Sequence, residues 1–193
     1  MSKNLLPKDG LVTYQSNVVE QSQAAEFYQK LFKEIAWRND EIIIFGKKII
    51  TSRKTAWYGD KEFVYQYSKI DRFALSWTPT LKIIKKLVEE IVGENFNSCL
   101  LNLYHSGEEG MCWHCDNENS IIKNSTIASL SLGAERKFSF KHKLEQESIS
   151  LNLENASLLL MKNQTQQNWL HSLPKSKKVK EPRINLTFRK MVE

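Results

Sequence analysis

The sequence predicts an α+β domain with a β-sandwich or jelly-roll core, because two helical segments come first and a series of short strands follows. With 193 residues, the chain is long enough to bury a core without disulfides or other cross-links. We therefore expect one domain over residues 1–193, with supporting helices within residues 10–97 and the β core within residues 98–193.

Two amphipathic helices are expected in the first half. Between residues 20 and 37, large apolar side chains such as Phe27 recur at three- and four-residue spacing. For the second helix, Thr78 is the expected N-cap, Pro79 takes the first helical position, and Gly93 follows the last turn. The apolar stripes of both helices indicate that they pack against a sheet.

The strands of the expected core are short apolar or alternating runs bounded by turn residues. They span residues 99–104, 111–116, 127–132, 137–143, 148–153, 156–161 and 183–190.

His114, Asp116 and His171 form a candidate metal site. Two imidazoles and one carboxylate are the ligand set of a non-haem Fe(II) centre that keeps open positions for other ligands. On one strand, a two-residue spacing places His114 and Asp116 on the same face, and His171 can return from a distant strand. We therefore expect Fe(II) at these residues.

The segment 183–189 has one polar face. Arg183, Asn185, Thr187 and Arg189 would share it, while the residues between them are apolar. In a half-exposed strand such a face would simply be solvated. Two arginines separated by amide and hydroxyl groups also suit a small dicarboxylate, because a guanidinium binds a carboxylate through two charge-assisted hydrogen bonds. Together with an iron site, this face favours 2-oxoglutarate as the co-substrate.

The cysteines invite a second metal interpretation. Cys112-x-x-Cys115 could hold zinc or act in redox chemistry, but residues three apart on a strand face opposite ways, and no second cysteine pair completes a tetrahedral site. Only Cys99 remains, and an odd number of cysteines favours a reducing compartment.

Composition limits the choice of partners only loosely. The net charge of +6 favours a polyanionic partner, although many proteins without one are equally basic. The basic runs at 53–54, 141–143 and 175–180 can also be ordinary solvated charges. Because the start of the chain lacks an apolar leader and no stretch is apolar enough to span a bilayer, we expect a soluble intracellular protein.

Several motifs occur in order along the chain. They are Asn102-Leu103-Tyr104, His114-Cys115-Asp116-Asn117-Glu118, Ser129-Leu130-Ser131-Leu132-Gly133-Ala134, His171-Ser172-Leu173-Pro174 and Pro182-Arg183-Ile184-Asn185-Leu186-Thr187-Phe188-Arg189. In these motifs the chain resembles the AlkB family of Fe(II)/2-oxoglutarate dioxygenases, most closely the homologues that repair alkylated bases in duplex DNA. The similarity runs from about Gly10 to the C-terminus.

The resemblance implies a double-stranded β-helix (jelly-roll) core with the metal at its open end, preceded by a nucleotide-recognition region and supporting helices within residues 10–97. It also implies an oxidative demethylase of 1-methyladenine and 3-methylcytosine in DNA, which consumes O2 and releases formaldehyde, succinate and CO2.

The resemblance also assigns co-substrate contacts. They are Asn102, Tyr104, Arg183, Asn185, Thr187 and Arg189. Arg183 with Tyr104 would hold the distal carboxylate of 2-oxoglutarate. Arg189 with Asn102 would lie near the carboxylate next to the metal.

The resemblance also implies substrate contacts, mainly before the core. They are Phe45, Gly46, Lys47, Arg53, Tyr65, Tyr67, Asn117, Glu118, Lys177 and Lys178. Phe45 resembles the tip of a hydrophobic finger that fills the gap left by a flipped base, although the segment can also be a buried strand that ends in a glycine turn. Tyr67 would stack on the flipped base opposite His114, with Tyr65 and Glu118 at its polar edges, although aromatic stripes are more often core.

Two positions depart from the family pattern. Asn117 stands where the closest homologues commonly carry a second acidic residue, which could change the preference among damaged bases. Ser176 replaces an expected basic residue beside Lys177 and Lys178, so affinity for duplex DNA could be lower than in the homologues.

Two alternatives stay open. The same chemistry could act on RNA such as transfer RNA, although a wedge at Phe45 favours duplex DNA. The chain could also be a damage-binding module with an inactive centre, although intact metal and co-substrate residues argue against this. We expect a monomer that binds nucleic acid and no membrane, cytoplasmic in a prokaryote and nuclear in a eukaryote.

Overall fold

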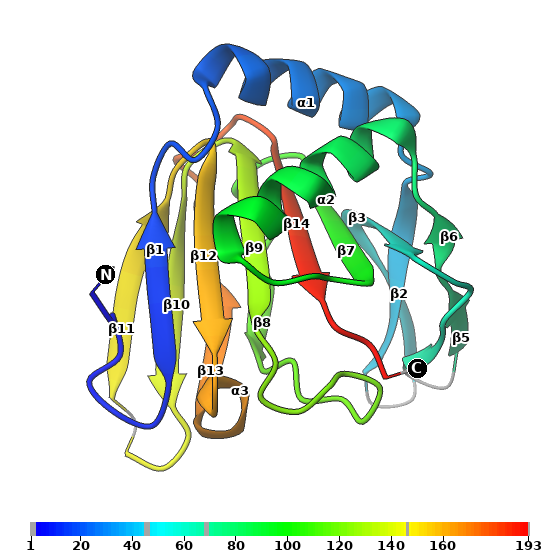
Figure 1. Cartoon of the computed structure of the whole chain (residues 1–193). Helices are drawn as coiled ribbons and strands as arrows, with labels where there is room; N and C mark the ends of the chain where they lie inside the picture. Colours follow the sequence, from blue (N-terminus) through cyan, green and yellow to red (C-terminus); the bar gives the residue numbers. More distant parts are fainter. Residues whose placement is uncertain (1–2, 45–46, 68–69, 146, 193) are drawn as a thin grey trace.

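The structure of the protein, a computed structural model, describes residues 3–44, 47–67, 70–145 and 147–192. Its centre is a large sheet with strand order β1-β12-β9-β14-β7-β3-β2, and β6 pairs with β3 off this path (Figure 1). These strands are β1 (Leu11–Gln15), β2 (Arg38–Ile44), β3 (Lys47–Gly59), β6 (Leu75–Ser76), β7 (Ser98–Tyr104), β9 (Ile127–Gly133), β12 (Ser157–Lys162) and β14 (Arg183–Arg189). Within it, only β3 and β6 pair in parallel.

A smaller antiparallel sheet has the order β11-β10-β13-β8. Its strands are β8 (Met111–His114), β10 (Arg136–His142), β11 (Ser148–Leu153) and β13 (Trp169–Leu173). A separate hairpin joins β4 (Val64–Tyr67) and β5 (Ile70–Phe73). The two sheets are mostly antiparallel and form the jelly-roll core that the sequence analysis expected.

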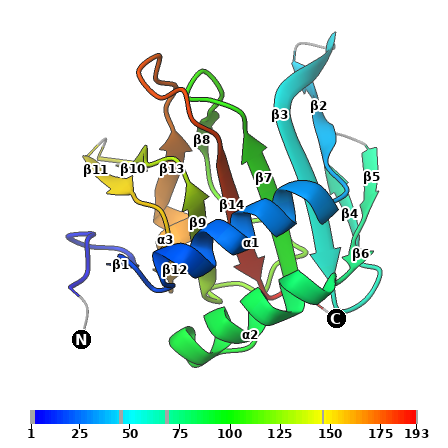
Figure 2. The same ribbon diagram turned by 90° about the horizontal axis from the view of Figure 1, so that it is seen from above.

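The helices are α1 (Gln21–Glu34), α2 (Pro79–Val92) and the short α3 (Thr165–Asn168). The predicted caps of α2 are confirmed, because the Thr78 hydroxyl accepts a hydrogen bond from the Leu81 amide at 3.2 Å and Gly93 adopts the left-handed conformation, with φ 73°. The long helices α1 and α2 lie across one face of the large sheet, and the small sheet lies on the other (Figure 2).

Alternation along the strands of the large sheet separates its two faces. Beneath α1 and α2, Phe27 and Leu81 pack with strand residues such as Leu101, Leu130 and Ile184 in one buried cluster. This burial removes apolar area from water and holds the helices on the sheet.

The opposite face of the large sheet carries both apolar and polar side chains. At its β1 and β12 end, Val12 and Leu159 pack with Phe140 and Trp169 of the small sheet in a second cluster. Farther along the sheet, the paired strands β7 and β14 carry buried polar side chains, such as Asn102 and Arg183, on this same face. The fold therefore leaves a buried polar region between the two sheets.

The expected strands are present with small shifts at their ends, but the expectation for residues 111–116 was wrong at one end. Strand β8 ends at His114, so Asp116 does not project from the same strand as His114. The expected set of core strands also omitted β13, which carries His171. Four of its five residues are buried, so it lacks the alternation that marks a half-exposed strand.

The first half of the chain contributes more than helices. Strands β1, β2, β3 and β6 all join the large sheet together with strands from beyond residue 98. In the described part of the chain, no helix is both long and apolar enough to cross a membrane.

Candidate active site

Two histidines face each other across neighbouring strands. In the antiparallel pairing of β8 with β13, His114 lies opposite His171. Their ring centroids are 4.2 Å apart, and the rings meet edge to face at 63°. Cross-strand pairing therefore brings together two ligands that are far apart in the sequence.

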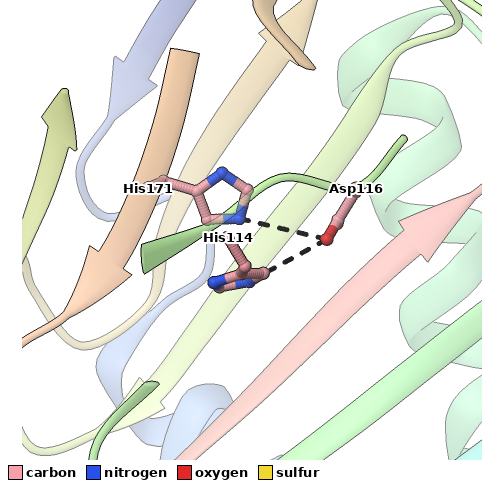
Figure 3. A group of neighbouring side chains, drawn as sticks. All are labelled: His114, Asp116 and His171. Atoms are coloured by element: carbon pink, nitrogen blue, oxygen red, sulfur yellow. Dashed lines mark ion pairs between the residues drawn. The ribbon is translucent and has the colours of Figure 1, made fainter. Parts of the chain in front are cut away.

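Asp116 reaches the same point from the loop after β8. Its Oδ1 lies 3.9 Å from His114 Nε2 and 4.0 Å from His171 Nε2 (Figure 3). Its backbone amide donates to Gln166 Oε1 at 2.9 Å instead of joining a strand ladder. The cluster predicted from the sequence is present, but a side chain from α3 holds Asp116 in place.

The orientation and charge of this cluster suit a metal ion. His114 Nδ1 lies 2.8 Å from the Cys112 carbonyl and would donate to it, which leaves Nε2 as the ligand atom on the Asp116 side. Burial lowers the pKa of His171 to about 3, with a further contribution from His114, so this ring is neutral at pH 7. Two imidazole nitrogens and a carboxylate fit Fe(II).

Arg189 fixes the other oxygen of Asp116. Its Nη2 and Nε donate to Asp116 Oδ2 at 2.6 and 3.1 Å. Burial alone would raise the pKa of Asp116, but Arg189, with smaller contributions from His171 and His114, lowers it to about 2. The carboxylate is thus ionised, with Oδ1 facing the histidines. The co-substrate contact expected for Arg189 stays a prediction.

The co-substrate residues line up across the large sheet. Arg183 of β14 lies opposite Tyr104 of β7, and Asn185 lies opposite Asn102. Arg183 Nη2 donates to Ser131 Oγ at 2.9 Å. Arg183 Nε and Asn102 Oδ1 are buried and have no hydrogen-bond partner among the described residues. Since a buried polar atom without a partner is costly, these atoms indicate a place for a polar ligand.

The electrostatics of Arg183 fit an anion. Burial lowers the pKa of its guanidinium to about 10, so it remains charged at pH 7 but has lost its hydration. Its Cζ lies 5.6 Å from the centre of the Tyr104 ring. A carboxylate would restore the interactions that burial removes.

The other two predicted co-substrate residues bond within the sheet. Asn185 Nδ2 donates to Ser129 Oγ at 2.8 Å and to the Leu130 carbonyl at 3.1 Å. The Thr187 hydroxyl donates to Asn185 Oδ1 at 3.4 Å. Ser129, Ser131 and Gln166 were not among the site residues predicted from the sequence. The alternation of serine with leucine in β9 could have indicated the two serines, but no sequence signal marks Gln166.

The predicted substrate residues are only partly described. Phe45 and Gly46 lie outside the described residues. For Lys47, Tyr65 and Tyr67, the structure describes only the backbone, within β3 and β4.

The remaining predicted substrate residues occupy different environments. Lys177, Lys178 and Asn117 are exposed, and Glu118 is half-buried two residues after Asp116. Arg53 is only 7% exposed, and its Nη1 lies 3.2 Å from Met111 Sδ, so its guanidinium is inside the protein near the start of β8.

The cysteines, which were the other candidate metal ligands in the sequence, do not belong to this cluster. Within the described ranges, His114, Asp116 and His171 are the only group of three or more His, Cys, Asp or Glu residues close enough to share an ion. The exposed Cys112 and the half-buried Cys115 belong to no such group. The zinc interpretation of the cysteines therefore has no support among these residues.

Comparison with known proteins agrees with this site. The model of the 2OG-Fe(II) oxygenase superfamily matches residues 11–189. The DNA oxidative demethylase ALKBH2 of Bos taurus is 37% identical over 182 residues, which cover 89% of this chain and 66% of that protein. The alpha-ketoglutarate-dependent dioxygenase alkB homolog 3 of Bos taurus is 36% identical over 181 residues, which cover 89% and 63%.

A solved structure supports the fold. The structure of OsALKBH1 aligns with a TM-score of 0.62 at 16% identity and covers 93% of this chain and 97% of that one. The chain spans slightly less than two thirds of the length of the two curated relatives. The superfamily uses Fe(II) and 2-oxoglutarate, which the His114, Asp116 and His171 cluster and the buried Arg183 are suited to hold. The DNA oxidative demethylase ALKBH2 of Homo sapiens is 37% identical over 182 residues, which cover 89% of this chain and 70% of that protein. From this similarity and the matched length of the superfamily model, the chain belongs to the AlkB family of the 2OG-Fe(II) oxygenase superfamily.

Proposed function

We propose that the protein is an Fe(II)- and 2-oxoglutarate-dependent dioxygenase that removes N-methyl groups from 1-methyladenine and 3-methylcytosine in DNA. The observation that carries the proposal is that β14 connects the two sites: its Arg189 bonds to Asp116 of the ligand cluster, and its buried Arg183, at an alternate position of the same strand, suits a dicarboxylate. The relative ALKBH2 of Bos taurus is a DNA oxidative demethylase, which supports DNA as the substrate.

The ligand residues would define the reacting centre. His114, His171 and Asp116 would hold Fe(II) through two nitrogens and one oxygen, and Arg189 keeps the carboxylate ionised and oriented. When bound, iron with 2-oxoglutarate and O2 supplies the oxidation of the N-methyl carbon. The methyl carbon would leave as formaldehyde, while 2-oxoglutarate becomes succinate and CO2.

The predicted co-substrate residues of β7 and β14 would orient 2-oxoglutarate. Arg183 would bind its distal carboxylate, because its Nε has no partner among the described residues and Ser131 accepts only one of the two Nη2 hydrogens. Asn102 lies two residues before Tyr104 on the same strand face. A half turn of its amide exchanges oxygen for nitrogen and would present a donor to a carboxylate. The apolar cluster on the other face of β14, which includes Ile184 and Leu186, keeps water from that side of these groups.

Release of formaldehyde from methylated oligonucleotides tests the proposed substrate. The panel should contain 1-methyladenine and 3-methylcytosine in DNA and in RNA, each single-stranded and duplex, with iron and 2-oxoglutarate supplied. We expect the highest kcat/KM on duplex DNA. Preference for RNA would move the substrate to the RNA alternative, and binding of methylated DNA without turnover would favour the inactive damage-binding module.

The exposed lysines of residues 175–180, the basic loop, should contribute a salt-dependent part of DNA affinity. Each lysine that contacts a phosphate releases condensed counterion, which changes the slope of log affinity against log salt by roughly 0.9 for B-DNA. The double variant Lys177→Ala/Lys178→Ala should therefore flatten the slope on duplex DNA.

A charge-matched control distinguishes contact from net charge. The variant Lys82→Ala/Lys86→Ala removes the same charge from exposed positions on α2, beyond the outer face of the large sheet. It should leave the slope close to that of the wild type. If both double variants gave the same slope, the basic loop would contribute only overall charge.

Phe45 should determine competence on duplex DNA. Extraction of a base costs a few kcal/mol of stacking and pairing, and an aromatic side chain in the gap can offset part of that cost. A single strand has no such gap. The variant Phe45→Ala should lose much more activity on duplex than on single-stranded 1-methyladenine DNA at the same salt concentration. Equal losses on both substrates would instead indicate a general role in binding or folding.

A further inference from the structure

Arg136, the first residue of β10, is a buried charge that the proposed reaction does not use. Its side chain is among the largest of those that are almost completely buried, at 2% exposure. No carboxylate pairs with it in the described structure; its guanidinium donates instead to backbone carbonyls. An arginine is rarely buried without a specific task, because its charge loses hydration.

Four carbonyls surround this guanidinium. Nη1 donates to the carbonyl of Ser106 at 3.2 Å. Nη2 lies 3.3, 2.7 and 3.0 Å from the carbonyls of Gly107, Glu109 and Pro174. A planar fork of five donors can serve several acceptors at once, which an ammonium cannot do with the same geometry.

These carbonyls belong to two loops from different parts of the chain. Residues 106–109 follow β7, which carries Tyr104, while Pro174 follows β13, which carries His171, and leads into the basic loop. The loops also bond directly, because the Gly107 amide donates to the Val179 carbonyl at 2.8 Å and the Ser176 amide donates to the Gly107 carbonyl at 2.7 Å. Arg136 thus donates hydrogen bonds to both of the loops that form this contact.

The contact between the loops leaves no room at Gly107. A Cβ on this residue would lie 2.1 Å from the Ser176 carbonyl oxygen and 2.9 Å from that of Val179. Backbone atoms cannot yield as a flexible side chain can, so any larger residue would push the basic loop away. Glycine at this position therefore serves the close approach of two backbones.

Arg136 also lies near the residues expected to bind the co-substrate. Its Cζ lies 5.8 Å from the centre of the Tyr104 ring, and the Arg183 Cζ lies 5.6 Å from the same ring. Burial lowers the pKa of Arg136, as it does that of Arg183. One buried guanidinium thus lies beside the expected dicarboxylate site and holds the root of the basic loop.

We propose that Arg136 is a positioning residue that fixes the basic loop relative to the active site and thereby sets the affinity of the protein for nucleic acid. This inference rests on the proposed function, since it requires Lys177 and Lys178 to meet phosphates. Without the guanidinium of Arg136, the four carbonyls must accept hydrogen bonds from water instead. Lys177 and Lys178 then lose their fixed position. The residue would act on the substrate only through the loop.

The test measures duplex DNA affinity against salt for holoenzyme loaded with iron and 2-oxoglutarate. The variants are Arg136→Lys, Gly107→Ala, Lys177→Ala/Lys178→Ala and the combination of Arg136→Lys with the two alanines. Arg136→Lys keeps the charge but loses the fork, whereas Gly107→Ala displaces the same loop and leaves Arg136 intact. Lys137→Gln removes an exposed charge next to Arg136 and serves as the control.

We expect Arg136→Lys and Gly107→Ala to flatten the salt slope as the two alanines do, by up to roughly 0.9 per lost phosphate contact. The combined variant should show no further flattening, because residues that act through one contact are not additive. KM for methylated duplex should rise while kcat is largely retained. Calorimetry should show that 2-oxoglutarate still binds, and Lys137→Gln should behave as the wild type.

Each contrary result has a distinct meaning. A wild-type slope in Arg136→Lys and Gly107→Ala, together with a flattened slope in the two-alanine variant, would overturn the inference and leave the proposed function intact. A wild-type slope in all of them would overturn both the role of the basic loop and the inference. Loss of iron, 2-oxoglutarate and DNA binding together in both variants would make Arg136 a folding residue and also overturn the inference.

Discussion

Replacement of Arg183 with alanine should weaken 2-oxoglutarate binding by about 30-fold to several thousand-fold. The loss of one partner from a buried, charge-assisted pair costs about 2–5 kcal/mol, and about 1.4 kcal/mol corresponds to tenfold in affinity. The structure supports the upper part of this range, because Arg183 is almost completely buried and its Nε has no partner in the described part of the chain.

Anaerobic calorimetry on the iron-loaded protein measures this effect without turnover. Arg183→Lys should bind 2-oxoglutarate better than the alanine variant but worse than the wild type, because it keeps the charge and loses the bidentate fork. Ser131→Ala removes only the neutral hydroxyl that orients Nη2 and should cost much less. An affinity that is unchanged in Arg183→Ala would show that the co-substrate binds elsewhere.

Replacement of His171 with alanine should abolish iron binding at stoichiometric protein concentration and, with it, demethylation. Loss of a residue that only hydrogen-bonds to a metal ligand typically costs about 10–100-fold in metal affinity or activity. Loss of a ligand itself should therefore cost more. His171 is one of only two imidazoles in the cluster, and Asp116 alone cannot replace its nitrogen.

Metal analysis after gel filtration decides this prediction. A suitable control is His142→Ala, since His142 is also a buried histidine of the small sheet but packs against Trp169, away from the cluster. The control should retain iron if it folds, which circular dichroism can check. Stoichiometric iron in a folded His171→Ala protein would show that the assignment of the ligands is wrong.

Local patterns in the sequence predicted much of the fold. The caps of α2 depend only on Thr78, Pro79 and Gly93 and on neighbouring backbone, so they are visible in the sequence. The polar face of β14 was equally visible, because its side chains alternate with apolar residues that enter the core beneath the helices. Both features arise from periodicity within one element.

Features that depend on tertiary contacts were not predictable in this way. The position of Asp116 depends on Gln166 in α3 and on Arg189 in β14, which are far away in the sequence. The loop-holding role of Arg136 likewise depends on carbonyls from two distant segments. A carbonyl has the same chemistry in every residue, so no sequence motif marks it as an acceptor.

We propose above that oxidative demethylation takes place at the cluster of His114, Asp116 and His171, with 2-oxoglutarate held by Arg183. This claim is tested most directly by measuring methyl loss, formaldehyde and succinate in one reaction with duplex DNA that contains 1-methyladenine, Fe(II), 2-oxoglutarate and O2. We predict one formaldehyde and at least one succinate for each methyl group lost, and neither methyl loss nor formaldehyde when 2-oxoglutarate is omitted. Methyl loss that proceeds without 2-oxoglutarate, or no formaldehyde from a protein that binds both iron and 2-oxoglutarate, would contradict the claim.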